Sequence, residues 1–294
     1  MTDLAIETSG LSKKFGSLVA LNGLDLSVPQ GSVFGFLGRN GAGKTTTIKM
    51  LLGLLSPTSG SVCVLGMDPK KDGMAIKRQV GYVAESQSMY GWMKVKEILK
   101  FTSGFYSNWD HAFASDFCRR FELDPKAKVK SLSKGQQMRL ALTLALSFHP
   151  RLLILDDPTM GLDPITRKEF LNDIVLSLHE EGRTVFFSTH ILGELERVAD
   201  SVAIIDRGKL KVAGEIDALK SSMKIVRMTF DNSPPLNIHV DGILRVQTNG
   251  RDCAVTLTNF TDDKLCQLER LYAPAHIEAN NLSLDEIFTE FVLS

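Results

Sequence analysis

The sequence has few cysteines and no long apolar run. The four cysteines, Cys63, Cys118, Cys253 and Cys266, lie far apart in a chain of 294 residues and lack the spacing of metal ligands. Nothing here indicates a disulfide framework, and a reducing cytosol is expected. The longest apolar run is well short of the roughly 18 residues that cross a bilayer, and no basic and then apolar leader opens the sequence. We therefore expect any role at a membrane to depend on a partner.

The sequence also has no net charge. Lys plus Arg and Asp plus Glu both number 34, so the formal charge at pH 7 is zero. Such a chain has no long-range field that favours nucleic acid or an anionic membrane surface. The composition therefore disfavours a basic DNA-binding protein, and we expect no nucleic-acid partner.

Strand-like and helix-like segments alternate along most of the chain. Three short apolar runs at residues 4–6, 18–21 and 24–28 are typical of an antiparallel sheet. Buried strands are expected at residues 32–37, 80–84, 152–155, 184–187 and 202–205. Helical periodicity marks residues 43–55, 95–105, 112–121, 134–148, 165–179 and 191–198. This alternation predicts an α/β fold in which parallel strands are joined by helices.

Two boundaries divide this pattern. Residues 86–150 contain helical signals with few strand signals, which predicts a helical subdomain. After Gly214 short strands are expected at residues 225–230, 243–247 and 254–257, with a Pro-containing loop after the first. We therefore predict one large domain over residues 1–220 and a small α+β accessory domain over residues 221–294.

A phosphate-binding loop lies between a predicted buried strand and a helix. Its glycines allow consecutive amide N–H groups to face phosphates, and the helix amino terminus adds partial positive charge. Lys44 is placed to reach the β- and γ-phosphates, and Thr45 offers a hydroxyl to Mg²⁺. The expected ATP-binding residues are Gly38, Arg39, Asn40, Gly41, Ala42, Gly43, Lys44, Thr45 and Thr46.

Two other segments carry polar groups at the ends of predicted elements. The apolar strand at residues 152–155 ends in Asp156 and Asp157, which either serve a metal and a reacting water or merely begin the turn before Pro158. Ser133 and Gln136 have the spacing of a helix capping box. The same helix terminus, with Gly135 free of a side chain, can also approach an anion closely.

The order of these segments resembles the nucleotide-binding cassette of ABC ATPases. Between the phosphate loop and the acidic strand lies Leu132-Ser133-Lys134-Gly135-Gln136, which is similar to the family signature Leu-Ser-Gly-Gly-Gln except that Lys134 replaces the first Gly. The resemblance covers about residues 4 to 220. It implies a P-loop NTPase fold with a RecA-like mixed sheet core, an antiparallel β subdomain and a helical subdomain.

The resemblance also implies site roles. Asp156 would hold the metal, Asp157 would polarise the attacking water, and His190, after the strand at 184–187, would contact the γ-phosphate as the switch histidine. The usual residue at position 157 is Glu, and losing one methylene withdraws the carboxylate by about 1.5 Å. Misplacement on that scale can cost roughly a hundredfold in rate.

Three further positions have two interpretations each. Phe15 would stack on adenine, although it could instead pack in the core. Glu85 occupies the Q-loop position that usually holds Gln, where it would contact Mg²⁺ or its water, or it is a plain loop residue. Asp163 belongs to a segment similar to the D-loop, and it also suits a helix cap before Pro164.

The function that the resemblance implies is hydrolysis of ATP with Mg²⁺. Two cassettes would face head to tail, in a homodimer or a heterodimer, and Ser133, Gly135 and Gln136 would serve the ATP of the partner. Separate transmembrane permease subunits would hold the pair at the cytosolic face of the cell membrane and would export a substrate that this chain does not define. The alternative is a soluble ABC ATPase that acts on DNA or ribosomes, which the zero net charge disfavours.

Overall fold

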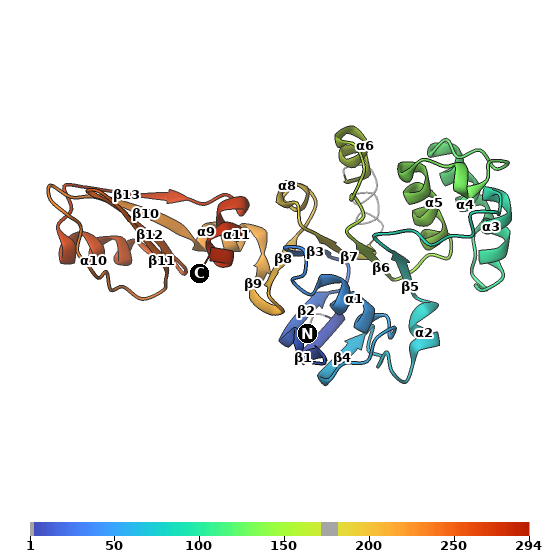
Figure 1. The fold of residues 1–294 in the computed structure, drawn as a ribbon, viewed down its shortest axis with the longest axis horizontal. Coiled ribbons are helices and arrows are strands. Elements are labelled where there is room, and N and C mark those ends of the chain that lie inside the picture. The colour runs from blue at the N-terminus through green and yellow to red at the C-terminus, as the bar shows by residue number, and fades with distance from the viewer. Residues whose placement is uncertain (1–2, 172–181, 294) are drawn as a thin grey trace. The chain divides into compact units, whose positions relative to one another are not determined.

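The computed structural model describes residues 3–171 and 182–293 (Figure 1). The chain forms two compact units, Met1–Leu210 and Lys211–Ser294. The sequence placed the border near residue 220. No helix among the described residues is long and apolar enough to cross a membrane.

A six-stranded sheet forms the centre of the first unit. Its strand order is β5-β6-β7-β3-β8-β9. The first five strands of this order pair in parallel, as the alternation of strands and helices predicts. The bounds are β3 (Val33–Gly38), β5 (Val80–Val83), β6 (Leu152–Asp156), β7 (Thr184–Thr189), β8 (Ser201–Asp206) and β9 (Lys209–Glu215). The carboxyl ends of these parallel strands meet at one edge, where the site is built.

A second sheet of the first unit is antiparallel, in the order β2-β1-β4. Its strands are β1 (Leu4–Phe15), β2 (Leu18–Pro29) and β4 (Ser59–Val64). The expectation of two short strands at 18–21 and 24–28 is wrong, because Gly23, at φ +67°, keeps both segments in one irregular strand. Ser59 and Gly60 begin β4. The pairing of β1 with β2 contains register shifts, and β-bulges of this type let a strand continue where a turn is expected.

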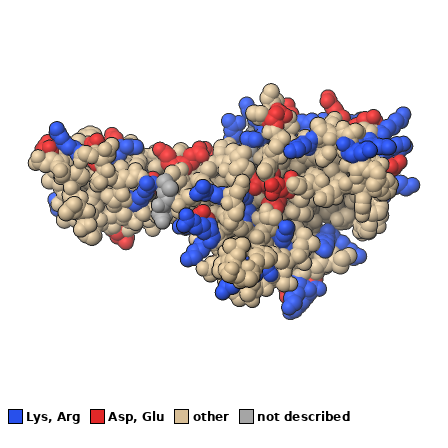
Figure 2. Space-filling view, viewed as in Figure 1, with Lys and Arg blue, Asp and Glu red and all other residues tan. Residues whose placement is uncertain are grey.

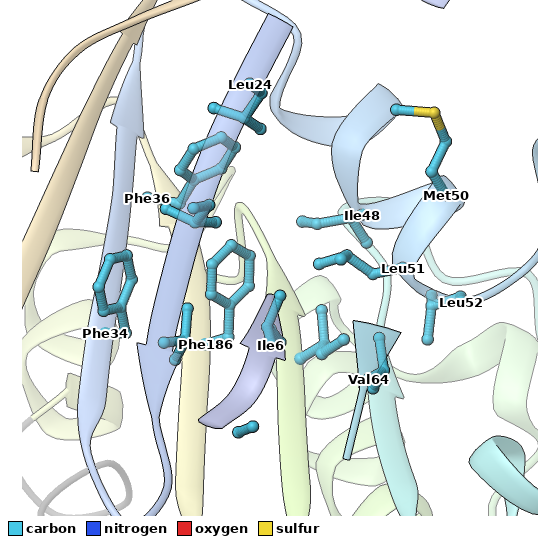
Figure 3. Packing of buried hydrophobic residues seen from close by; sticks show 14 of the residues in the cluster. Ile6, Leu24, Phe34, Phe36, Ile48, Met50, Leu51, Leu52, Val64 and Phe186 are labelled. Atoms are coloured by element: carbon cyan, nitrogen blue, oxygen red, sulfur yellow. The ribbon is translucent and has the colours of Figure 1, made fainter. Parts of the chain in front are cut away.

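One hydrophobic core joins the two sheets to helix α1 (Lys44–Leu51). Ile48 and Leu51 of α1 are fully buried in it. Figure 3 shows them beside the ring of Phe186, which packs 5.4 Å from Phe36 and 6.0 Å from Phe34 between ring centroids. Burying a side chain of this size contributes roughly 1.5–3 kcal/mol. The core thereby fixes α1, and with it the phosphate loop, against the sheet.

The predicted helical subdomain is present between β5 and β6 (Figure 1). It contains α3 (Val95–Ser103), α4 (His111–Arg120), the short η1 (Val129–Ser131) and α5 (Lys134–Leu146). The three helices match the predicted segments to within about two residues, the accuracy that helix ends allow. Asp110 caps α4, because its carboxylate accepts a hydrogen bond of 2.9 Å from the amide of Phe113. The sequence did not predict α2 (Gly73–Lys77), which precedes β5.

Two short helices follow β6 and β7. They are α6 (Pro164–Glu169) and α8 (Leu192–Leu195). The helix expected at 165–179 begins with α6, and its residues from 172 onward lie outside the described residues. The α8 helix is shorter than the stretch at 191–198 that the sequence predicts.

The second unit contains a four-stranded antiparallel sheet in the order β11-β12-β10-β13. Its elements are α9 (Ile216–Ser222), β10 (Lys224–Thr229), β11 (Ile243–Asn249), β12 (Asp252–Leu257), α10 (Asp262–Tyr272), β13 (His276–Asn281) and α11 (Leu284–Leu293). Leu268 of α10 is fully buried against Val226 and Val255 of the sheet. Three of the strands were predicted. The polar strand β13 was not, because it has few of the residues that favour strands.

Candidate functional site

The phosphate loop connects β3 to α1, as the sequence predicts. Gly43 caps α1 with φ +111°, and a Cβ at this position would lie 2.8 Å from Leu21 Cδ1. A Cβ at Gly38 would lie 2.6 Å from the backbone oxygen of Ile205. Only glycine fits these two positions, since any side chain would collide with β2 or β8. The amide groups of the loop therefore stay open toward a ligand at the helix terminus.

Lys44, the first residue of α1, is only 5% exposed. Its Nζ donates a hydrogen bond of 2.8 Å to the backbone oxygen of Gly38 and lies 3.3 Å from Asp157 Oδ2. A buried ammonium group needs such partners. The lysine charge is thus held beside the loop amides, where phosphate oxygens would bind.

Asp156 ends β6 and is 1% exposed. Its Oδ1 accepts hydrogen bonds from Thr45 Oγ1 at 3.2 Å and from Ser188 Oγ at 2.9 Å. Burial raises the pKa of the Asp156 carboxyl above its usual value, the two hydrogen bonds oppose this rise, and the neighbouring Asp157 adds to it. Thr45 and Asp156 thus bring two oxygen atoms together where a cation would relieve the cost of the buried charge.

These two side chains, which the sequence predicted as metal ligands, present oxygen donors of the kind that Mg²⁺ takes. Mg²⁺ prefers oxygen ligands and usually takes one or two carboxylates together with substrate phosphates and waters. Within residues 3–171 and 182–293, no group of three His, Cys, Asp or Glu side chains is arranged to hold a metal. The donors available here therefore match a metal whose remaining ligands come with the nucleotide.

Asp157 follows directly and has a left-handed backbone, with φ +43°. Its amide donates to Ser188 Oγ at 3.0 Å, and its Oδ1 lies 2.9 Å from His190 Nδ1. A residue other than glycine in this conformation is uncommon and is found at functional positions. The structure thus brings Lys44, Asp157 and His190 together, although they are distant in sequence.

Ser188 is a site residue that the sequence did not single out. It is fully buried at the end of β7, and its hydroxyl bridges Asp156 Oδ1 and the amide of Asp157. The parallel register places Ser188 directly opposite Asp156. The signal that could have identified it is its position at the carboxyl end of a strand next to β6.

A cavity of about 650 Å³ adjoins these groups. Such a volume is in the range of small-molecule and cofactor sites. Of the expected residues, Phe15 and Glu85 line it with much of the phosphate loop, whereas Leu18, Val19 and Arg207 are additions that the sequence did not indicate. The lining comprises Phe15, Leu18, Val19, Ala20, Arg39, Asn40, Gly41, Gly43, Lys44, Thr45, Thr46, Glu85, Asp157 and Arg207.

Phe15 lies at the end of β1 and is 48% exposed, so it is not a core residue. Lys13 Nζ lies 5.1 Å from the centre of its ring. An exposed aromatic face in a nucleotide-sized cavity is suited to stacking on a base. The geometry therefore favours the stacking interpretation over core packing.

Glu85 follows β5 and also lines the cavity of 650 Å³. Its carboxylate is close enough to Tyr82 to contribute, after burial and Asp156, to raising the pKa of Tyr82 to about 12. Glu85 thus lies near the acidic end of β6. This position is suited to the metal or water contact that the sequence proposed.

Ser133 and Gln136 form the predicted capping box at the start of α5, with Gly135 between them. Ser133 Oγ accepts from the Gln136 amide at 3.2 Å, and Gln136 Oε1 accepts from the Ser133 amide at 3.0 Å. Among the described residues that line the 650 Å³ cavity, none comes from this turn. The structure does not bring the signature turn to the phosphate loop of its own chain.

Asp163 is confirmed as a helix cap. Its Oδ1 accepts from the amides of Ile165 and Thr166, both at 3.0 Å, at the start of α6. Hydrogen bonds from the hydroxyl and the amide of Thr166 hold the pKa of Asp163 below its usual value. The carboxylate is thus committed to local structure in this chain.

Comparison with known proteins agrees with this geometry. Residues 21–160 match the family model described as ABC transporter. The chain is 41% identical to the ABC transporter ATP-binding protein YbhF of Escherichia coli (strain K12), over 74% of this chain and 38% of YbhF, so it spans about two fifths of that relative. It is 36% identical to the bacitracin transport ATP-binding protein BcrA of Bacillus licheniformis, over 83% of this chain and 85% of BcrA.

A solved structure supports the same assignment. The ATP-binding subunit of an ABC transporter superposes with a TM-score of 0.68 at 28% identity, covering 74% of this chain and 92% of that one. The expected fold, a mixed α/β sheet with an antiparallel β subdomain, is confirmed. The chain belongs to the ABC transporter family.

Proposed function

We propose that the 650 Å³ cavity binds ATP with Mg²⁺ and that Asp157 accepts the proton of the attacking water. The observation that carries this proposal is the convergence of Lys44 and His190 on the Asp157 carboxylate, at 3.3 Å and 2.9 Å. The loop amides and Lys44 bind the β- and γ-phosphates, and Phe15 stacks on the adenine. Thr45 and Asp156 hold Mg²⁺ with a contribution from Glu85, and the ion supplies positive charge to the phosphates.

Hydrolysis then follows from the placement of these groups. Water adds to the γ-phosphorus, the bond to the β–γ bridging oxygen breaks, and the water proton passes to Asp157. His190 holds the Asp157 carboxylate in place through its Nδ1. Lys44 stabilises the charge that develops on the phosphoryl oxygens. The products are ADP and inorganic phosphate.

The signature turn serves the nucleotide of a second copy. Ser133, Gly135 and Gln136 lie at the amino terminus of α5, outside the cavity of their own chain. A helix amino terminus with an exposed serine binds an anion well, so the turn requires a phosphate from elsewhere. Two chains facing head to tail supply it in both sites, which makes the homodimer the simplest assembly and a heterodimer the alternative.

A permease subunit binds the helical subdomain. A groove of about 390 Å³ there is lined by residues that include Tyr82, Met89, Thr102, Tyr106 and Phe148. Beside it lies an aromatic patch, defined by Tyr90, Trp92, Phe101 and Phe105, which are 43–67% exposed and contact one another edge to face or tilted. Exposed contiguous aromatic surface of this kind marks a protein interface.

Basic side chains also lie on the helical subdomain, as Figure 2 shows at the right of the view. They include the exposed Lys96, Lys126, Lys128 and Lys130. Lysines at the rim of an apolar surface suit a partner embedded in the membrane, whose cytosolic loops lie near anionic headgroups. The chain therefore acts at the cytosolic face of the membrane, where it powers transport through the permease, as the name of BcrA describes for bacitracin.

Co-purification tests this function. When the full chain is tagged, expressed in its native host and purified in detergent, a polytopic membrane protein is expected to co-purify with it. Trp92→Ser with Phe105→Ser should abolish that recovery without reducing ATP turnover. Leu236→Ser, a fully exposed control in the second unit, should leave it unchanged. Recovery of ribosomes or DNA alone would contradict the transport function.

A further inference from the structure

Lys13 contacts the aromatic ring that lines the nucleotide cavity. Its Nζ lies 5.1 Å from the centre of the Phe15 ring, within the distance of about 6 Å at which an ammonium group is attracted to an aromatic face. Phe15 lines the cavity of 650 Å³, whereas Lys13 is not among the described residues that line it. The contact therefore leaves the ring available to a base on its cavity side.

The ammonium group of Lys13 is itself held in place. Its Nζ donates a hydrogen bond of 2.7 Å to the backbone oxygen of Ser56, in the segment that follows α1. Among residues 3–171 and 182–293, no carboxylate forms an ion pair with this ammonium group. The Ser56 oxygen and the Phe15 ring are therefore the two groups that orient it.

The backbone on either side of Lys13 is bound to the same segment. The Thr58 amide donates to the Ser12 oxygen at 2.8 Å, and the Lys14 amide donates to Thr58 Oγ1 at 3.0 Å. In the pairing of β1 with β2, Lys13 lies opposite Leu21, which is fully buried. The side chain of Lys13 thus extends from a fixed backbone to the segment after α1. Because α1 begins at the phosphate loop, this cation connects the ring to the element that carries the loop.

Packing alone does not orient the Phe15 ring, because about half of its surface is exposed. A ring that is already oriented loses less conformational entropy when a ligand binds. We propose that Lys13 is a positioning residue, whose cation holds the Phe15 ring in the orientation that stacks on the base of the nucleotide. The inference rests on the proposed function, because the orientation of the ring matters only if a nucleotide occupies the cavity.

Calorimetric titrations of the full chain with ATP and with inorganic triphosphate test this role. Lys13→Met keeps most of the length of the side chain and removes the cation. It should raise the Kd of ATP about two- to fivefold, the scale of an exposed cation–π contact. The Kd of inorganic triphosphate, which has no base, should not change. Lys13→Arg should retain the ATP affinity, because a guanidinium group also binds an aromatic face and can donate to the Ser56 oxygen.

A double variant shows whether the cation acts through the ring. Lys13→Met should cause no further loss of ATP affinity in a protein that already carries Phe15→Ala. The matched control is Lys14→Met, which removes the exposed neighbouring lysine and should change neither Kd. Three results would overturn the proposal: an unchanged ATP affinity in Lys13→Met, the same loss in the Phe15→Ala background, or an equal loss for inorganic triphosphate.

Nuclear magnetic resonance of the nucleotide-free protein gives a second readout that requires no binding. The Hε signal of Lys13, identified by its loss in Lys13→Arg, should be shifted upfield by the ring and should return to the ordinary lysine position in Phe15→Leu. A Lys13 signal at the ordinary position in the unchanged protein would also overturn the proposal. If Phe15→Ala does not weaken ATP binding, the stacking in the proposed function is rejected instead. The two failures are therefore distinguishable.

Discussion

The Nδ1 atom of His190 lies 2.9 Å from Oδ1 of Asp157, across the gap between the ends of β7 and β6. The contact leaves Asp157 6% exposed at its side chain and His190 35% exposed. The histidine thus covers the carboxylate on one side, while Lys44 lies 3.3 Å from its other oxygen. A water that reacts with bound ATP would meet a carboxylate whose orientation is fixed from both sides.

His190→Ala is therefore expected to reduce kcat by roughly a hundredfold, the scale of a lost acid–base or positioning group. KM for ATP should change little, because the phosphate loop and Phe15 keep their geometry. Steady-state ATP hydrolysis measures both values. The control is His149→Ala, which removes a histidine that pairs with Asp110 at 3.1 Å, away from the cavity. Equal losses in the two variants would contradict the role of His190.

Ser188→Ala tests the bridge between the two carboxylates. Losing the hydroxyl removes one hydrogen-bond acceptor of the buried Asp157 amide, which should lower the free energy of unfolding by about 1–3 kcal/mol. It should also lower kcat, because Asp156 and Asp157 lose a common anchor. Ser147→Ala is a matched control, since Ser147 is equally buried and donates only to the Thr143 oxygen in α5. Denaturant unfolding and ATP turnover should separate the two variants: both lose stability, but only Ser188→Ala loses activity.

The role of Ser188 shows where prediction from sequence ends. Lys44, Thr45 and Asp156 were predictable, because contiguous motifs place them at the ends of single elements. Ser188 gains its role only from the register that pairs it with Asp156 across two parallel strands, and no local pattern encodes that register.

The helices and strands likewise divide into those that a local pattern predicts and those that depend on pairing with a distant segment. Helices with strong periodicity, such as α3 and α4, were predictable nearly to their ends. The long strand β2 was not, because Gly23 is typical of a turn, whereas in the structure its positive φ and the pairing with β1 keep the strand continuous. Three strands of the second unit were predictable from their apolar residues. β13 is polar and was not predictable, because it forms a strand by pairing with β10.

Asp156 predicts a dependence of stability on pH. Its pKa in the folded state lies above that of the unfolded chain, so the folded state binds more protons between the two values. The penalty for its buried charge is fully present above the folded pKa and is relieved as pH falls through it. Asp156→Asn removes the penalty and should raise the Tm of the nucleotide-free protein at neutral pH.

The same variant should lose the effect of Mg²⁺ on ATP binding. Thermal melts with ATP, with and without Mg²⁺, check both expectations. A lower Tm for Asp156→Asn without nucleotide would contradict the penalty for the buried charge. An unchanged response to Mg²⁺ would contradict the placement of the metal at Thr45 and Asp156. Asp206→Asn is a control carboxylate, also buried but at the end of β8.

Phe15→Ala is expected to weaken ATP binding about 5- to 150-fold, since stacking on a base contributes roughly 1–3 kcal/mol. Phe15→Trp should retain the affinity. Calorimetric titration with ATP measures the change, and Phe105→Ala removes a comparably exposed ring outside the cavity. Similar affinities for Phe15→Ala and the unchanged protein would show that the ring does not contact the nucleotide.

The central claim is that Asp157 serves the attacking water although the family usually places Glu there. Its φ of +43° suits Asp, whose short side chain tolerates the left-handed region, and its carboxylate already contacts Lys44 and His190. Asp157→Asn keeps the size of the side chain and removes its basicity. Asp157→Glu keeps the basicity and adds the missing methylene.

The most direct test is ATP turnover of the unchanged protein and these two variants at saturating Mg²⁺ and ATP. The account predicts that Asp157→Asn lowers kcat at least about a hundredfold with little change in KM, and that Asp157→Glu stays at least about tenfold above Asp157→Asn. Equal turnover for Asp157→Asn and the unchanged protein would contradict it.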